Sequence, residues 1–298
     1  MKKVLVLAAA MMAVVMSAKA EVEFAYDAGF EAVSAYIWRG QYNGGLSLQP
    51  DLEVGYDGEH SSLRFGVWGN IGASDWGFRR GLPNYIDPED GVTVINPNTR
   101  FMPELDLVLS YKMYGLTLGA NHYYYCDGSN FFSWGKDANY IETDDAGDEY
   151  CNTTSTTEVW AGYNFGELTK AGLFFNWYTT VAGGDFNDDN GKLKRAWSSY
   201  FEIGYEHNFE AVGITFDAIV GMSPWKSPIY GNEKFAVTNI CLKLNKEWEF
   251  DNFTLDLFAQ GSLNTDQLTR ENVFIKASGD AKLYKQKLNG VIGLGFWF

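Results

Sequence analysis

After its first twenty residues, the sequence lacks any apolar run long enough for a membrane helix, although 46% of its residues are hydrophobic. A helix that crosses a bilayer needs about 20 consecutive, mostly apolar residues. The mean hydropathy is −0.22, which is typical of a water-soluble chain. Strands of a membrane barrel show their apolar face only at alternate positions, so these values exclude a helical membrane protein and leave a barrel open.

Basic residues are also scarce. The chain has 23 lysines and arginines against 38 aspartates and glutamates, and its formal net charge is −15. A protein that binds nucleic acid needs clustered positive charge to meet the phosphates. The chain has no basic tract, so we expect no nucleic-acid partner.

Cysteine and histidine are too few and too scattered for a metal or catalytic site. The cysteines show no metal-ligand spacing, and His60, His122 and His207 have no nearby serine with the polar support of a hydrolytic triad. The acidic stretch 185–191 resembles a calcium-binding loop, but its glycine is displaced and the final glutamate is missing. We therefore expect no metal, no cofactor and no catalytic residue, and a solvated surface loop at 185–191.

Two of the three cysteines, Cys126 and Cys151, flank one acidic, loop-like segment. In an oxidising compartment they could form a disulfide that staples this loop. Two buried free thiols are the alternative.

The N-terminus indicates export. Lys2 and Lys3 precede an apolar core at 4–16, and 17–20 end in the small-x-small pattern of a cleavage site. These features predict a signal peptide at 1–20 and one mature domain at 21–298.

Alternation of apolar and polar residues is the main structural signal in the mature chain. Leu46, Leu48, Leu52, Val54 and Tyr56 alternate with polar or small residues, which predicts a strand with one apolar face. The length of this segment suits a tilted membrane strand. The same pattern recurs and predicts about twelve strands, at 27–39, 46–57, 63–71, 104–113, 116–125, 158–165, 171–181, 197–209, 212–222, 240–245, 253–262 and 288–298.

The predicted connections alternate between short and long, except for a brief first connection at 40–45. Short periplasmic turns and long extracellular loops are typical of outer-membrane barrels. A secreted β-sandwich also has alternating strands, but it does not have loops that are long on one side only. The fold class we expect is therefore all-β, a transmembrane antiparallel up-and-down β-barrel of about 12 strands.

Aromatic residues are expected in two bands on the apolar face, where rings lie at the level of the lipid headgroups. One band, near the short turns, comprises Tyr56, Phe165, Phe209, Phe253, Phe296 and Phe298. The other, near the long loops, comprises Tyr36, Trp38, Tyr124, Trp177 and Trp197. Five further rings are expected to face inward, namely Trp68, Tyr123, Trp160, Tyr178 and Tyr200.

Several short segments together resemble a known bacterial family, the TorF-type porins. They are S-A-Y-I-W-R-G at 34–40, L-Q-P at 48–50, G-Y at 55–56, F-G-V-W-G-N at 65–70, E-L-D-L at 104–107, Y-Y-Y at 123–125 and T-E-V-W-A-G at 157–162. Pro50 and the acidic insert at 137–149 depart from the pattern of that family. The resemblance implies a porin-like barrel and does not imply a particular solute.

Charged residues on the polar face form the candidate site. We expect the following to line a channel: Arg39, Asp51, Glu53, Arg64, Glu104, Asp106, Lys112, Glu158, Glu202, Glu206, Asp217, Lys243 and Asp256. Such a lining could select solutes by charge and shape. It could equally form a lattice of salt bridges that fills a narrow barrel, because an interior of about twelve strands is neither reliably filled nor reliably open.

Taken together, the sequence predicts a porin-like channel for passive diffusion of small hydrophilic solutes in the outer membrane of a Gram-negative-type bacterium. The alternative is a structural or adhesive barrel with an occluded lumen and acidic surface loops. The expected partners of the protein are outer-membrane lipids, small hydrophilic solutes and the barrel assembly machinery. Phe296 and Phe298 resemble the C-terminal aromatic signal by which that machinery recognises barrel proteins.

Deletion of 296–298 is expected to reduce outer-membrane insertion more than it alters any channel property, because it removes this aromatic signal. The amount of folded protein in isolated outer membranes, compared with the full chain, measures the effect. Normal insertion of the shortened chain would refute the assembly role.

Overall fold

A computed structural model describes residues 23–74, 85–86, 93–94, 103–126, 131–132, 141–143, 147, 149–151, 153, 155–169, 172–265, 271–275, 281–285 and 287–298. The expected signal peptide at 1–20 lies outside the described residues, as does most of the acidic insert at 137–149. No helix in the described part of the chain is long and apolar enough to cross a membrane.

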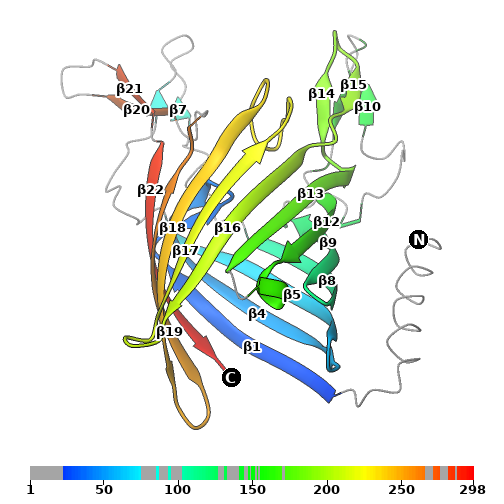
Figure 1. Ribbon diagram of the computed structural model, residues 1–298. Coiled ribbons are helices and arrows are strands. Elements are labelled where there is room, and N and C mark those ends of the chain that lie inside the picture. Colours follow the sequence, from blue (N-terminus) through cyan, green and yellow to red (C-terminus); the bar gives the residue numbers. More distant parts are fainter. Residues whose placement is uncertain are drawn as a thin grey trace.

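Twelve antiparallel strands form one closed barrel, which confirms the expected fold class (Figure 1). Around the ring their order is β1, β22, β19, β18, β17, β16, β13, β12, β9, β8, β5 and β4. Their bounds are β1 Glu23–Val33, β4 Leu46–Asp57, β5 Ser61–Ser74, β8 Glu104–Met113, β9 Leu116–Tyr124, β12 Thr156–Asn164, β13 Leu173–Gly183, β16 Ser199–Phe209, β17 Ile214–Ser223, β18 Ala236–Glu249, β19 Thr254–Leu263 and β22 Leu288–Trp297.

The last strand closes the ring, as its sequence predicts. β22 pairs with β19 on one side, where Leu294 faces Leu257, and with β1 on the other, where Leu294 faces Ala32. The backbone amide of Phe298 also donates to the carbonyl of Ala28 at 2.8 Å. The hydrogen-bond ladder of the barrel is therefore continuous, and β22 has no open edge.

The outward face of the barrel is apolar and uncovered. Leu242 and Ile292, both in the middle of strands, are 54% and 61% exposed in the isolated chain. Exposed rings lie at both ends of the barrel, for example Tyr56 and Phe209 at the short-turn end and Trp197 at the long-loop end. A contiguous apolar face of this kind, flanked by aromatic residues, is the surface that a transmembrane barrel presents to lipid.

The smaller elements belong to the connections. They are β2 Tyr36–Trp38, β3 Gln41–Gly44, β6 Tyr85–Ile86, β7 Thr93–Val94, β10 Ile141–Thr143, β11 Glu149–Cys151, α2 Gly166–Thr169, β14 Phe186–Asp188, β15 Leu193–Arg195, β20 Glu271–Ile275 and β21 Ala281–Lys285. Except for α2, they form two-stranded hairpins within the longer connections. In Figure 1, β14 and β15 extend beyond the barrel at the end opposite the C-terminus.

The first connection differs from its prediction. The strand expected at 27–39 ends at Val33, and Tyr36 and Trp38 belong to a separate hairpin, β2–β3. Tyr36 is only 7% exposed, so these two rings are not part of an outer aromatic band. Alternation continues through the hairpin because the hairpin is itself made of strands, and alternation alone cannot locate the break.

Glycines on the inner wall make room for aromatic rings that lie flat against it. A Cβ atom added to Gly293 would lie 2.2 Å from the Phe258 ring on the neighbouring strand. One added to Gly221 would lie 1.9 Å from the Tyr200 hydroxyl oxygen. The wall therefore holds large rings without their projecting far into the lumen.

Gly293→Val is expected to destabilise the barrel by about 1–3 kcal/mol, the usual cost of overpacking, because it displaces the Phe258 ring. The matched control is Gly290→Val on the same strand, where the nearest atom to an added Cβ is 4.0 Å away. The temperature at which folded protein changes its migration on a detergent gel measures the difference. Equal melting of the two variants would contradict this account of the wall.

Candidate functional site in the barrel lumen

The lumen hairpin, which we define as β2–β3, folds into the barrel through a tight turn. Arg39 and Gly40 at the turn have φ angles of +49° and +83°. Positive φ at both central residues is typical of the turn that joins tightly paired strands. Only glycine fits at position 40, because an added Cβ would lie 2.0 Å from the backbone oxygen of Thr238 on β18.

The lumen hairpin crosses the barrel from one wall to the other. It leaves the wall between β1 and β4, and its tip reaches β12 and β13, which lie opposite in the ring of strands. Along the way the Tyr36 ring lies 5.4 Å from Trp68, and the Trp38 ring lies 5.7 Å from Tyr123.

Apolar contacts support the lumen hairpin on its other side. Ile37 and Tyr42 pack against a buried cluster that consists of Val33, Ala35, Phe258 and Val291. At its base, Ser34 and Ile292 exchange two hydrogen bonds of 2.9 Å. The strands β2 and β3 pair with each other and not with the wall, so side chains hold most of the hairpin in place.

The Arg39 guanidinium occupies a site that we call the Arg39 cage. Its two terminal nitrogens donate to the Glu158 carboxylate at 2.7 and 2.9 Å, and one of them also donates to the Tyr230 hydroxyl at 2.6 Å. The guanidinium carbon lies 3.8 Å from the centre of the Tyr178 ring and 4.9 Å from that of Tyr200. The side chains of Arg39 and Glu158 are only 10% and 3% exposed.

Such a buried cation is stable only when its charge and its donors are satisfied. The bidentate carboxylate satisfies the charge, and the ring faces attract the cation through their negative quadrupoles. Glu158 in turn accepts hydrogen bonds from the Tyr123 hydroxyl at 2.5 Å and the Asn121 amide at 2.9 Å. The wall thus fixes the carboxylate independently of Arg39.

The connection at 224–235 contributes the Tyr230 side of the Arg39 cage. The Tyr230 ring stacks on Trp38 and on Tyr200, with centroids 5.7 and 5.5 Å apart. A buried chain of hydrogen bonds fixes this segment. The Ser227 hydroxyl accepts from the backbone of Tyr230 at 3.0 Å and donates to Ser198, which donates to Asp185 at 2.6 Å.

Asp185 therefore differs from its prediction. It was expected in a solvated surface loop at 185–191, yet its side chain is fully buried. It accepts hydrogen bonds from both the backbone and the side chain of Ser198, while Asp188 and Asp189 are exposed as expected. Burial raises the pKa of Asp185, and the Ser198 hydrogen bonds oppose that rise.

A second acidic group, Glu104 and Asp106 on β8, is buried beside the lumen hairpin. Glu104 accepts hydrogen bonds from the hydroxyls of Tyr36 and Tyr125. Asp106 has one oxygen without a hydrogen-bond partner, and it forms no ion pair with the described residues. Near the lumen hairpin, buried carboxyl groups therefore outnumber the cationic side chains.

Two further charged groups line the wall nearer the short turns. Arg64 bonds Glu53 at 2.9 Å and also Asp57. Lys243 interacts electrostatically with Asp217 and Asp256, and its amine lies 4.3 Å from the centre of the Phe258 ring.

The remaining predicted lining residues also lie on the inner face by strand register. Asp51 faces Trp68 across β4 and β5, and Glu202 accepts a hydrogen bond from Asn176 at 2.8 Å. Lys112 and Glu206 lie near the short-turn end. Arg39 differs from the other predicted lining residues because it lies on the lumen hairpin and not on a wall strand.

The sequence did not predict that Tyr230 and Asn121 belong to the site. It also did not predict that Trp38 lies inside the barrel. Tyr230 lies in an irregular connection, where no periodicity marks a buried residue. The aromatic residues around it, Trp225 and Phe235, were the available signal in a loop otherwise expected to be polar.

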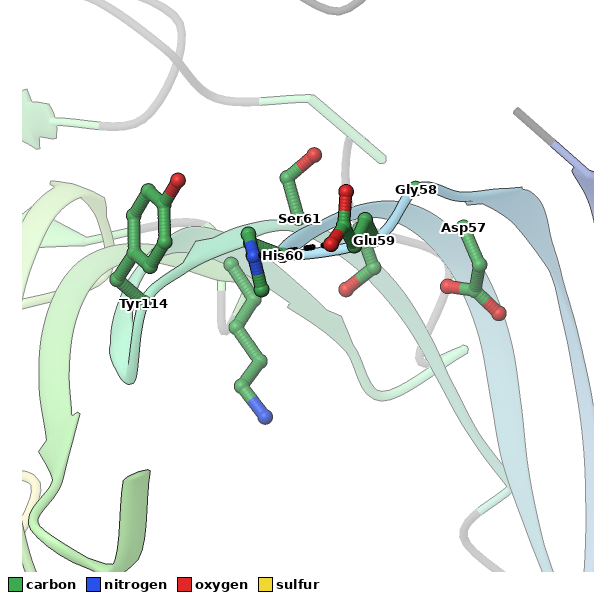
Figure 2. A pocket seen from close by; sticks show the side chains of 8 residues that line it. Asp57, Gly58, Glu59, His60, Ser61 and Tyr114 are labelled. Carbon is green, nitrogen blue, oxygen red and sulfur yellow. Dashed lines mark ion pairs between the residues drawn. The ribbon is translucent and has the colours of Figure 1, made fainter. Parts of the chain in front are cut away.

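A hollow of about 210 Å³ lies at the short turns (Figure 2). Asp57, Glu59, His60 and Tyr114 line it, and His60 lies 3.5 Å from the Glu59 carboxylate. Besides exposed turn residues, its lining includes the half-buried Asp57, Ser62 and Lys112 of the wall strands. We assign this hollow no function.

The metal-binding, histidine and cysteine chemistry considered from the sequence forms no site among the described residues. In the described residues, no group of three or more His, Cys, Asp or Glu side chains is arranged to hold a metal. The buried His122 contacts Thr157 at 2.8 Å and Phe131. The Cys126 thiol points towards the Tyr124 carbonyl at 4.0 Å. The side chain of Cys151 lies outside the described residues, so the Cys126–Cys151 disulfide stays a prediction.

Comparisons with known proteins add only distant likenesses. No family model and no curated protein matches the sequence, so the resemblance to TorF-type porins stays a prediction. Among solved structures, an outer membrane channel from Pseudomonas putida F1 is 11% identical, with a TM-score of 0.43 over 93% of this chain and 94% of that one. Salmonella typhi OmpF is 10% identical, with a TM-score of 0.36 over 94% and 98%. A TodX mutant, a monoaromatic hydrocarbon channel, is 10% identical, with a TM-score of 0.34 over 93% and 88%.

Glu158→Gln is expected to lower the free energy of unfolding by about 3 kcal/mol, because it leaves the buried Arg39 guanidinium without its carboxylate. Asp189→Asn is the matched control, since it makes the same chemical change in the exposed pair with Lys194 and should have no measurable effect. Urea unfolding in lipid vesicles, followed by tryptophan fluorescence, compares the two. Equal stabilities would contradict the structural role of the Arg39–Glu158 pair.

Proposed function

We propose that this protein is a porin-like channel of a bacterial outer membrane, through which small hydrophilic solutes diffuse passively. The observation that supports the proposal most directly is the contrast between the two faces of the closed barrel. The outer face is apolar and uncovered, while the inner face carries paired and unpaired charges from end to end. A polar interior within an apolar barrel suits a path for water-soluble molecules.

The charge of the lining favours cations over anions. Among the predicted lining residues, carboxylates outnumber arginines and lysines, and Asp106 forms no ion pair with the described residues. Negative charge around a passage raises the local concentration of cations and lowers that of anions.

The proposal includes the location and partners of the protein. A signal peptide at 1–20 would direct export, and the barrel assembly machinery would insert the chain, using Phe296 and Phe298 as its signal. The apolar outer face would then meet outer-membrane lipids.

A second candidate, a structural or adhesive barrel with a closed lumen, is supported by one specific observation. The lumen hairpin crosses the barrel, and Arg39 at its tip is fixed to the opposite wall by Glu158, Tyr178 and Tyr230. A hairpin that stays in this position obstructs the lumen.

Purified protein in a planar lipid bilayer is expected to give discrete single-channel current steps, because solutes pass through the lumen. Under a KCl gradient, the reversal potential should show a preference for K⁺ over Cl⁻. A silent bilayer with folded protein would contradict the channel and favour the closed barrel.

Glu206→Gln is the variant that tests the source of the preference, since it removes an exposed carboxylate on the inner face of β16. It should shift the reversal potential towards zero. Asp188→Asn, which changes an exposed loop carboxylate, serves as its control and should leave the potential unchanged.

A further inference from the structure

Apart from Trp38 of the lumen hairpin, whose ring centre lies 4.6 Å from the guanidinium carbon, the groups that hold Arg39 belong to the rest of the barrel. We call Glu158, Tyr178, Tyr200 and Tyr230 the wall part of the Arg39 cage, because all four come from wall strands or from the connection at 224–235. Together they present a carboxylate, two ring faces and a hydroxyl to one planar cation.

Contacts outside the lumen hairpin keep these groups in place. Tyr123 and Asn121 hold Glu158, Asn239 donates to the Tyr200 hydroxyl at 3.3 Å, and Ser227 holds the backbone of Tyr230. A site whose groups are already oriented binds its ligand without first having to order them.

Arg39 itself reaches this site as the tip of a separate element. The lumen hairpin makes no strand pairing with the wall, so its withdrawal would break none of the ladder hydrogen bonds that close the barrel. An occupant attached in this way has a high effective concentration, and a free solute must compete with it.

A second observation points to a cationic ligand. Asp106 faces Tyr123 across β8 and β9, and the Tyr123 hydroxyl bonds Glu158. Asp106 is 6% exposed, and one of its oxygens lacks a hydrogen-bond partner. A buried carboxyl group with one oxygen left without a partner thus adjoins the wall part of the Arg39 cage. The ring faces there favour an organic cation over a strongly hydrated metal ion.

We propose that the wall part of the Arg39 cage is a binding site for organic cations of the guanidinium or ammonium type. Arg39 is its resident occupant, which an arriving solute displaces. The part of this inference that concerns transport rests on the channel function proposed above.

Titration calorimetry of detergent-purified Arg39→Ala with methylguanidinium tests the site, because this variant empties it. Methylurea, which has a similar shape and no charge, is the matched ligand control. We expect saturable binding of methylguanidinium at least tenfold tighter than to the wild type, no binding of methylurea, and loss of binding in Arg39→Ala/Glu158→Gln. Absence of methylguanidinium binding to folded Arg39→Ala, or equal binding of methylurea, would overturn the proposal.

Arg39→Lys covers the case in which Arg39→Ala does not fold, since it keeps a positive charge beside Glu158. Lysine cannot form the bidentate pair, so it is a weaker occupant and methylguanidinium should bind this variant more tightly than the wild type. If Arg39→Lys binds it no better than the wild type, the occupant role of Arg39 is wrong.

The same ligands added to a planar bilayer separate this inference from the channel function. Methylguanidinium, and not methylurea, should reduce the current through Arg39→Ala. Current through the protein without methylguanidinium binding would contradict the proposed binding site and support the channel function. Methylguanidinium binding without any current would contradict the channel function and support the binding site.

Discussion

The continuous hydrogen-bond ladder of the barrel is the constraint on which the rest of the structure depends. In hydrocarbon, an unpaired strand edge costs several kcal/mol for each exposed backbone group, because no water is present to pair with it. The pairing of β22 with both β19 and β1 removes the last such edge. Once the ladder is closed, side chains on the outer face need only be apolar, as Leu242 and Ile292 are, and chemical variety is confined to the inside.

Closure of twelve strands creates a wider interior than that of an eight-stranded barrel, which wall side chains fill. The two ends of this interior hold different groups. Near the long loops, the lumen hairpin and Tyr230 enter the space, and every charge that they bury must be matched by a partner such as Glu158. Nearer the short turns, charged side chains such as Arg64 line the wall, and they pair with residues of the neighbouring strand.

The barrel could be predicted from the sequence because a period of two repeats in every wall strand and loop lengths alternate with it. The same period shows which side chains of a wall strand point into the barrel. The inward positions of Trp68, Tyr123 and Tyr200 follow from it. The lumen hairpin could not be separated from β1, because its own strands continue the alternation beyond Val33. Its partner Glu158 could not be identified either, since a contact across the lumen joins residues that no pairing register relates.

Arg39 and Arg64 show why topology, and not residue type, decides what a charge does in this lumen. Arg64 and its partner Glu53 lie on paired wall strands, so their ion pair joins parts that the backbone ladder already holds together. Arg39 bonds Glu158 from an element without backbone pairing to the wall, so its ion pair determines where that element lies. Loss of the first pair would leave the shape of the lumen unchanged. Loss of the second would leave the tip of the lumen hairpin with only its ring contacts and the close approach of Gly40 to Thr238, so the position of the tip in the lumen depends on this ion pair.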